Sequence, residues 1–343
     1  VYSSAPELFR PARLTDTNPQ VKDHALGRTE VVRWKSRDGL EVEGLLLYPV
    51  NYEPGKKYPL AVHVHGGPSG VYLQNFMASW SNFGQLWAGK GWAAFYPNFR
   101  GSSAYGEKFL RANLNGWGRG DFQDIQSGID LLVARGLADP ERLAQTGWSY
   151  GGYMTAWTIT QTARFKAAMV GAGLTNMFSM YSTNDLQRVL EEYFDGQPWQ
   201  RPEAYMQASA MNYIRQARTP TLILHGATDQ RVPLGQAQEL YKGLEKNGVP
   251  VELVTFPREA HGLGEPRHQL DKMKREYAWI ARHTLGGAPE MAAAEAVKIA
   301  PANFAELAGA IVNSLEVQPG ERVMMHLDPT YYPELADELR RAL

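Results

Sequence analysis

The sequence predicts an α/β protein with a mostly parallel sheet covered by helices on both faces. Two patterns indicate this fold class. Short apolar runs alternate along the chain with segments whose apolar residues recur every three or four positions. Several of these runs also end directly at glycines, which is typical of strands that turn sharply into a helix.

The expected elements follow one another in a regular order. A hairpin with strands at 31–35 and 42–48 surrounds the turn Arg37-Asp38-Gly39. An apolar strand then begins at Pro59 and leads into His65-Gly66-Gly67-Pro68. Further strands are expected at 92–96, 142–146, 166–170, 221–225 and 251–256. The helices between them are expected at 75–88, 121–135, 152–162, 235–247 and 266–283.

Three segments depart from this alternation. Residues 174–218 form a polar and aromatic insert, and inserts at the carboxyl ends of strands commonly build substrate pockets. Residues 1–30 are punctuated by prolines and are expected to be a connector with a strand remnant. After Gly287 the composition becomes rich in alanine. We therefore expect a main domain at 31–286 and, at 287–343, a linker with a small appendage that includes a helical pattern from Phe304.

Composition and charge exclude several classes of partner. With 35 Lys and Arg against 36 Asp and Glu, the net charge is −1, so nucleic acid and anionic membranes find no attractive field. No apolar run approaches the roughly 20 residues that span a bilayer. The absence of cysteine excludes disulfides and thiolate chemistry but leaves both a cytoplasmic and a periplasmic or secreted location open. Because the chain starts at Val1 without a leader, we expect a cut or processed N-terminus.

The most informative motif is Gly147-Trp148-Ser149-Tyr150-Gly151, which lies between an expected strand and an expected helix. This is the pattern of a nucleophile elbow, where a strained turn lifts a serine hydroxyl onto a helix N-terminus. Glycines flank the serine because side chains at those positions would collide in such a turn. The alternative is an ordinary Gly-Ser loop, and the strand-then-helix context favours the elbow.

A serine nucleophile needs a histidine base and an acid that orients it, in the chain order serine, acid, histidine. His261 follows the last expected strand and is favoured over His225, His268, His283 and His326. Asp229 follows the strand at 221–225, whereas exposure on a helix or in the insert explains Asp185, Asp195 and Asp271. We therefore expect Ser149, Asp229 and His261 to act together.

Two backbone N–H groups would complete such a site as an oxyanion hole. Tyr150 follows the nucleophile and supplies one, and the loop after the strand that begins at Pro59 supplies the second, which we assign to Gly67. The pair His63 and His65 also fits two metal ligands on one strand face. Since no third ligand stands at a suitable spacing, we expect neither a metal nor another cofactor.

Together these residues make the chain resemble the catalytic domain of the prolyl oligopeptidase family of serine peptidases, in its acylaminoacyl-peptidase and dipeptidyl-peptidase-like branch. The resemblance covers about residues 30–286, and the connector before them looks like the end of a propeller blade. Its motifs include His65-Gly66-Gly67-Pro68, Gly147-Trp148-Ser149-Tyr150-Gly151 and Glu259-Ala260-His261-Gly262, with further ones at 34–39, 98–102 and 219–226. Family members carry an N-terminal β-propeller, most of which is missing from this sequence.

The resemblance implies an α/β-hydrolase fold and the triad of Ser149, Asp229 and His261. It also implies that Arg231 binds a main-chain carbonyl of the substrate and that Val232 is a wall of the primary specificity pocket. The expected activity is hydrolysis of short peptides through an acyl-enzyme, of oligopeptidase, dipeptidyl-peptidase or acylaminoacyl-peptidase type. A carboxylesterase and a silent binding module on the same fold are the alternatives, and a homo-oligomer is left open.

Overall fold

The computed structural model describes residues 2–5, 8–13, 18–287, 337 and 341. Within these residues, eight strands form one sheet in the order β10-β9-β8-β7-β5-β6-β4-β3. The strands are β3 (Thr29–Lys35), β4 (Glu41–Leu47), β5 (Tyr58–Val64), β6 (Ala93–Asn98), β7 (Ala138–Trp148), β8 (Ala167–Gly171), β9 (Thr221–Gly226) and β10 (Val251–Phe256). β4 pairs antiparallel with β3 and β6, and all other pairs are parallel. The predicted mostly parallel sheet is confirmed.

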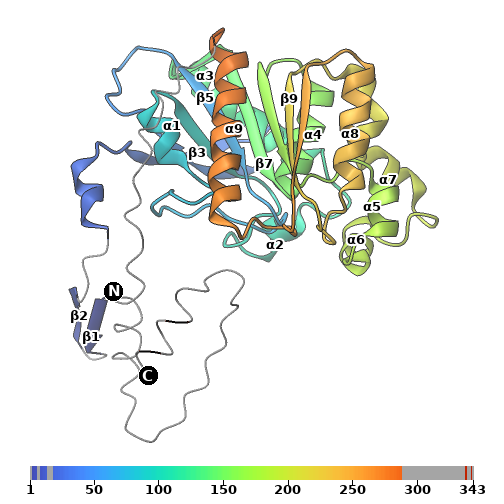
Figure 1. Ribbon diagram of the computed structural model, residues 1–343, viewed down its shortest axis with the longest axis horizontal. Coiled ribbons are helices and arrows are strands. Elements are labelled where there is room, and N and C mark those ends of the chain that lie inside the picture. The colour runs from blue at the N-terminus through green and yellow to red at the C-terminus, as the bar shows by residue number, and fades with distance from the viewer. Residues whose placement is uncertain (1, 6–7, 14–17, 288–336, 338–340, 342–343) are drawn as a thin grey trace, which may run out of the picture. The chain divides into compact units, whose positions relative to one another are not determined.

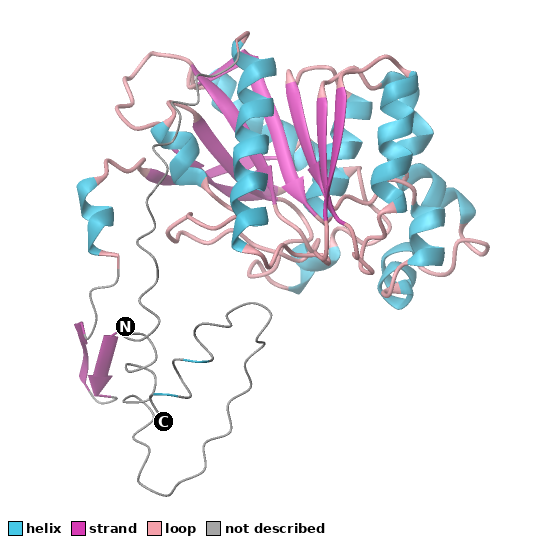
Figure 2. Cartoon of the chain, in the orientation of Figure 1, coloured by secondary structure: helices cyan, strands magenta, loops and turns pink. Residues whose placement is uncertain are grey.

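Helices cover both faces of this sheet (Figure 1). Apolar side chains of α3 (Gly120–Ala134), α4 (Tyr150–Gln161) and α8 (Gly235–Lys246) share one buried cluster with Leu60 and Val62 of β5. α1 (Gly84–Gly89) and α9 (Pro266–Leu285) pack in a second cluster with Ala61. Successive residues of a strand point to opposite faces, so the central strands are apolar throughout because both faces are buried. Figure 2 shows the resulting layers, with strands between helices.

The insert at 174–218 folds into short helices beside α8 (Figure 1). They are α5 (Met177–Thr183), α6 (Gln187–Phe194), α7 (Pro202–Ala208) and a 3₁₀ helix, Ala210–Gln216. Tyr181, Phe194 and Tyr205 are buried among them, whereas Trp199 is 67% exposed. Most of the aromatic residues that distinguish the insert in sequence are therefore packing residues of a small helical cap.

The helix expected at 75–88 is wrong over most of its length, because α1 begins only at Gly84. Ser79 and Asn82 bond to each other across a turn: the N–H of Ser79 donates to the Asn82 carbonyl at 2.8 Å, and the N–H of Asn82 donates to Ser79 Oγ at 3.1 Å. Serine and asparagine side chains compete in this way with helical hydrogen bonds. A short helix not expected from the sequence, α2 (Glu107–Arg111), follows β6.

The two ends of the chain are described only in part. β1 (Tyr2–Ala5) and β2 (Leu8–Arg13) form an antiparallel pair, and Pro19–Asp23 is a 3₁₀ helix. The chain divides into units at Val1–Pro289 and Glu290–Leu343, and the appendage expected at 287–343 lies almost wholly outside the described residues. The division into a connector, a main domain and an appendage stays a prediction. No helix in the described part of the chain is long and apolar enough to span a membrane.

Candidate active site

Ser149 lies at the sharp turn between β7 and α4, with φ 61° and ψ −121°. Its backbone N–H donates to the carbonyl of Gly171 at 2.9 Å, which ties the turn to the end of β8. A Cβ atom at Gly147 would lie 2.4 Å from the backbone of Gly151, and one at Gly151 would lie 2.0 Å from the carbonyl oxygen of Val64. Only glycine fits at either position, so the motif forms the strained turn that its pattern predicts.

Three side chains from three loops meet at this turn. His261, in the loop between β10 and α9, has Nε2 2.8 Å from Ser149 Oγ and Nδ1 2.8 Å from Asp229 Oδ2. Because a carboxylate only accepts hydrogen bonds, Nδ1 carries the proton and Nε2 accepts from the serine hydroxyl. The structure thus joins the three predicted residues in one hydrogen-bonded chain.

The carboxylate of Asp229 is held on both oxygens. Its side chain is fully buried, and Oδ1 accepts the backbone N–H groups of Arg231 and Val232, each at 2.9 Å. These contacts leave Oδ2 directed at His261. Backbone donors of this kind fix the direction of the carboxylate.

Of the other histidines considered as bases, one lies beside the acid, since His225 Nε2 is 3.5 Å from Asp229 Oδ2. His225 is fully buried, its Nε2 lies 2.7 Å from the Val232 carbonyl, and burial lowers its pKa. His268 pairs with Glu259, and His283 lies against Trp279 on α9. His326 is outside the described residues. Among the described candidates, His261 is the one in contact with Ser149.

A cavity of about 280 Å³ opens at Ser149. Gly67, Tyr150, Arg231, Val232 and His261 line it, so six of the seven predicted site residues, with Ser149 included, surround one space. Asp229 is the seventh and lies buried behind His261. The remaining wall is apolar and comes mainly from the insert, with the residues Trp117, Leu174, Met180, Leu186, Val189 and Leu190.

Arg231 has a partner at the rim of the cavity that the sequence did not suggest. Its Nε lies 2.7 Å from Asp185 Oδ1, and both side chains are nearly half exposed. The hydrogen bond from Arg231 holds the pKa of Asp185 below its ordinary value. By its sequence context Asp185 is expected to be a surface residue of the insert, because Asp185 and Arg231 are 46 positions apart and no local pattern relates them.

Tyr150 also has partners that the sequence did not suggest. Its buried hydroxyl donates to Oδ2 of Asp121 and accepts from Asn113 Nδ2 at 3.2 Å. Burial raises the pKa of Asp121 to about 6. Tyr150 thereby connects the nucleophile turn to the first turn of α3, where Asp121 also accepts the N–H of Phe122 at 2.8 Å.

The pair His63 and His65 does not face a common point. His63 stacks on Tyr96 with ring centroids 4.8 Å apart, and burial lowers its pKa to about 3. His65 lies with Nε2 2.8 Å from Ser102 Oγ, and burial lowers its pKa to about 4. Each is a neutral core histidine with separate partners.

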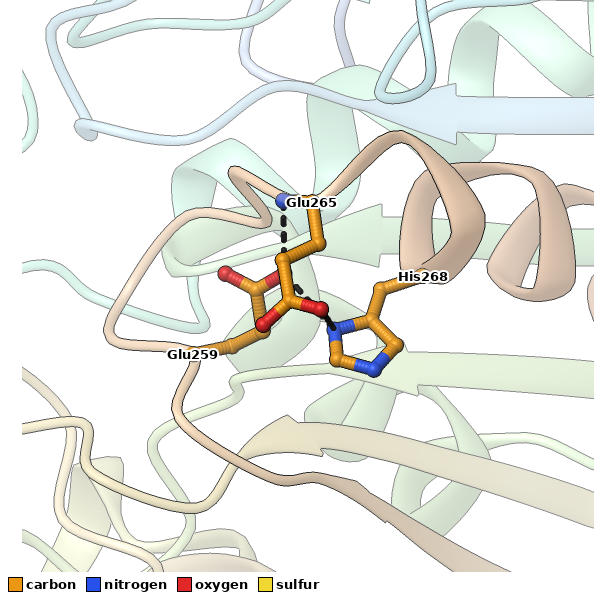
Figure 3. A group of neighbouring side chains, drawn as sticks. All are labelled: Glu259, Glu265 and His268. Atoms are coloured by element: carbon orange, nitrogen blue, oxygen red, sulfur yellow. Dashed lines mark hydrogen bonds and ion pairs between the residues drawn. The ribbon is translucent and has the colours of Figure 1, made fainter. Parts of the chain in front are cut away.

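A different group of potential metal ligands lies beside the loop of His261 (Figure 3). Glu259, Glu265 and His268 bring ligand atoms within 4.8 Å of one another. The Glu259 carboxylate already accepts the N–H groups of Gly264 at 2.7 Å and Glu265 at 2.8 Å. Its oxygens are engaged by the loop itself, so the group acts as a hydrogen-bonding network of the fold.

The chemistry available to this arrangement follows from its hydrogen bonds. An imidazole oriented by a buried carboxylate can accept the proton of a serine hydroxyl and thereby generate a nucleophile. The turn also presents the N–H of Tyr150, the first residue of α4, which has no acceptor within its own helix. Such a site is suited to acyl transfer.

Comparisons with known proteins show the family to which the chain is similar. The sequence profile of the prolyl oligopeptidase family matches residues 78–287. An uncharacterized peptidase of Bacillus subtilis, YuxL, is 34% identical over 277 residues, which are 79% of this chain and 42% of that protein. Dipeptidyl-peptidase 5 of Schizosaccharomyces pombe is 27% identical over 74% of this chain and 38% of its own length.

A solved structure gives the same result. An acylaminoacyl peptidase in complex with Z-Gly-Gly-Phe-chloromethyl ketone superposes with a TM-score of 0.74 at 34% identity, covering 80% of this chain and 45% of that one. The chain thus spans less than half the length of each of these relatives. The family match at 78–287 covers the strands from β6 to β10 and the segments that carry Ser149, Asp229 and His261.

Proposed function

The chain belongs to the prolyl oligopeptidase family, and we propose that it is a serine peptidase that hydrolyses short peptides through an acyl-enzyme intermediate. The observation that carries the proposal is the hydrogen-bonded chain from Ser149 through His261 to Asp229 at the opening of an apolar cavity. An ordinary Gly-Ser loop without a catalytic role does not account for a buried carboxylate that is hydrogen-bonded to an imidazole beside the serine.

In the first half of the proposed reaction, Ser149 Oγ forms a bond to the substrate carbonyl carbon while its proton passes to His261 Nε2. The carbonyl oxygen becomes an oxyanion, and we assign its stabilisation to the N–H groups of Gly67 and Tyr150. When the tetrahedral intermediate collapses, the C–N bond breaks and His261 returns the proton to the leaving amine. Asp229 keeps the imidazole in the correct tautomer throughout.

In the second half, water replaces the amine. His261 accepts a proton from the water molecule while the water oxygen attacks the carbonyl carbon of the acyl-serine ester. His261 then gives that proton to Ser149 Oγ as the ester bond breaks. The products are the free carboxylic acid and the original hydroxyl. No redox partner or metal is required by this sequence of steps.

The cavity supports an apolar residue on the acyl side of the cleaved bond. Its wall of leucine, valine and methionine side chains would lose water on contact with an apolar group and would leave a charged group without partners. A phenylalanine stands next to the reactive group of the ligand in the related acylaminoacyl peptidase. We assign Val232 to the wall of this pocket and Arg231 to a substrate carbonyl.

Covalent labelling tests the proposal most directly. Wild-type protein should react with a fluorophosphonate probe at one site and cleave a short peptide amide, whereas Ser149→Ala should do neither, because no other group occupies the end of the hydrogen-bonded chain. Labelling retained by that variant would contradict the assignment of the nucleophile.

A substrate comparison separates the proposed activity from the alternatives. Rates on a peptide amide and on an ester with the same acyl group should both be measurable, since an acyl-enzyme forms from either. Turnover of the ester alone would indicate a carboxylesterase. A folded wild-type protein that does not label would indicate a binding module.

A further inference from the structure

The loop that carries His261 has little regular structure of its own. We call residues 257–265 the histidine loop; it connects the end of β10 to the start of α9. Turns and bends replace a helix or strand here, so no ladder of backbone hydrogen bonds fixes the position of the imidazole. His261 must nevertheless lie within hydrogen-bonding distance of two other loops. The position of the imidazole therefore has to be fixed by contacts from outside the loop or by side chains of the loop itself.

Trp148 supplies one such contact. Its indole N–H donates to the backbone carbonyl of His261 at 2.6 Å, and Trp148 is the residue directly before Ser149. The indole is itself held in place, because it packs edge-to-face on Trp80 at 5.1 Å and closely over Gly171. A Cβ atom at Gly171 would lie 2.2 Å from the ring, so this glycine makes room for it. One rigid side chain thus links the nucleophile turn to the backbone of His261.

Glu259 supplies the second contact that fixes the histidine loop. Its side chain is buried, and its carboxylate accepts the N–H groups of Gly264 and Glu265 and faces His268 Nδ1 at 2.8 Å (Figure 3). Burial alone would raise the pKa of Glu259, but these donors bring it below its ordinary value. The carboxylate therefore stays ionised and closes the two ends of the histidine loop on each other.

The backbone of Glu259 makes a further link to the acid. Its carbonyl accepts both the N–H and the hydroxyl of Thr228, each at 2.9 Å, and Thr228 is the residue directly before Asp229. The histidine loop is therefore attached on one side to the nucleophile turn and on the other to the loop of Asp229.

From these contacts we infer that Trp148 and Glu259 are positioning residues, which hold His261 at the distance from Ser149 and Asp229 that proton transfer needs. Trp148 acts on the backbone of His261 itself, and Glu259 acts on the backbone of the histidine loop at Gly264 and Glu265. The inference rests on the proposed function, since it assigns them a role in the same reaction.

The test measures the rate constant of fluorophosphonate labelling separately from its end point. Trp148→Phe keeps an aromatic ring but removes the N–H donor, and Glu259→Gln keeps the shape but loses the charge. We expect the labelling rate constant and kcat to fall about 10- to 100-fold in Trp148→Phe and about 10-fold in Glu259→Gln, with KM changing less than about 2-fold. If these residues only stabilise the fold, the substitutions will lower the end point of labelling, which counts folded sites. The labelling rate constant of the sites that remain folded will then be unchanged.

Trp279→Phe is the matched control. The Trp279 indole N–H also donates to a backbone carbonyl, that of Pro220 at 3.4 Å, and the residue is buried on α9. Its replacement should leave the labelling rate constant at the wild-type value. Wild-type rate constants in both test variants, or an equal fall in Trp279→Phe, would overturn the inference. Failure of the proposed function would look different, because wild-type protein would then not label or Ser149→Ala would label as well.

Discussion

Arg231 shows how a single residue can be poised for a substrate. Its side chain lies at the rim of the Ser149 cavity, where Asp185 holds the guanidinium by a hydrogen bond of 2.7 Å and nearly half of the side chain is exposed to solvent. Donor positions of a guanidinium that are not used by one carboxylate remain available to a peptide carbonyl. The backbone N–H of the same residue holds Asp229, so the two ends of Arg231 serve different parts of the site.

Replacing this side chain should therefore affect substrate binding more than chemistry. Arg231→Gln is expected to raise KM for a short peptide about 10-fold and to change kcat less than about 2-fold, because a charge-assisted hydrogen bond to bound substrate is lost. Steady-state kinetics on one peptide series measure both. Arg188→Gln is the control, since Arg188 on α6 is 91% exposed in its side chain. An unchanged KM would contradict the assignment.

Asp121 is the second residue whose environment gives a measurable consequence. It is fully buried beside Tyr150, and burial raises its pKa to about 6. A carboxyl with a raised pKa is less easily ionised in the folded than in the unfolded protein. Its contribution to stability is therefore most favourable at low pH and is lost as pH rises from the unfolded-state pKa toward 6.

Asp121→Asn should remove this pH dependence. Relative to wild type, the free energy of unfolding of the variant should rise by about 2 kcal/mol between pH 4.5 and pH 7. Urea unfolding at both pH values measures the difference. Asp130→Asn, at a carboxylate on the same helix that is 54% exposed, is the control for loss of one acidic group. A constant difference between wild type and Asp121→Asn would mean that the carboxyl titrates normally.

At the scale of one element, the turn between β7 and α4 is the feature on which the site depends. The strand ends at Trp148, the helix begins at Tyr150, and Ser149 between them has a positive φ. Its neighbours Gly147 and Gly151 are in contact with backbone atoms, so the strain at the serine is supported by close packing on both sides.

Gly151→Ala should consequently destabilise the protein although it adds a single methyl group. The new Cβ would lie 2.0 Å from the carbonyl oxygen of Val64, and the backbone on both sides would have to move. We expect a loss of about 3 kcal/mol or more in the free energy of unfolding. Gly89→Ala in α1 is the matched control, since a Cβ there meets no atom within 4 Å. Its stability should stay equal or rise by about 0.5 kcal/mol.

At the scale of the molecule, a buried ion pair within α9 attaches this helix to β7 of the sheet. Lys272 Nζ lies 2.6 Å from Glu276 Oε2, and both side chains are almost fully buried. The hydroxyl of Thr146 in β7 donates to Glu276 Oε1 at 2.7 Å, and Lys272 donates to the carbonyl of Trp80 at 3.0 Å. The pair thus connects the strand that leads to Ser149 with the helix that follows His261.

Lys272→Met should break this connection at a large cost, because the carboxylate of Glu276 would remain buried without its cation. The expected loss in the free energy of unfolding is about 3–5 kcal/mol. Lys274→Met, at an exposed position on the same helix, should change it by less than about 0.5 kcal/mol. Chemical denaturation of both variants gives the comparison, and equal effects would show that the buried pair contributes nothing.

Much of this architecture could be predicted because it is encoded in local patterns. The alternation of buried strands with amphipathic helices predicts the fold class, which is confirmed. The glycines around Ser149 predict a strained turn, because only glycine fits so close to neighbouring backbone. Ser149, Asp229 and His261 each follow a strand of the expected parallel sheet, which predicts that they share an edge of the sheet, since parallel strands end on the same side. The structure brings the three together, and their roles remain proposed.

Local patterns failed where the deciding contact was distant in the sequence or where side chains competed with the backbone. The helix expected at 75–88 is mostly a loop because Ser79 and Asn82 form their own turn. Asp185 and Asp121 carry no motif that marks them as partners of Arg231 and Tyr150. The motif at 259–262 likewise does not indicate that the Glu259 carboxylate accepts the N–H groups at 264 and 265.

The sequence by itself therefore determined the fold class and the chemical types of the site residues, because periodicity and motif spacing act over short stretches of chain. Only the tertiary structure decided which other side chains hold these site residues in position. Trp148 reaches His261 across 113 residues and Thr146 reaches Glu276 across 130. Such contacts depend on how whole strands and helices pack, and a residue's own neighbours in sequence carry no physical trace of them.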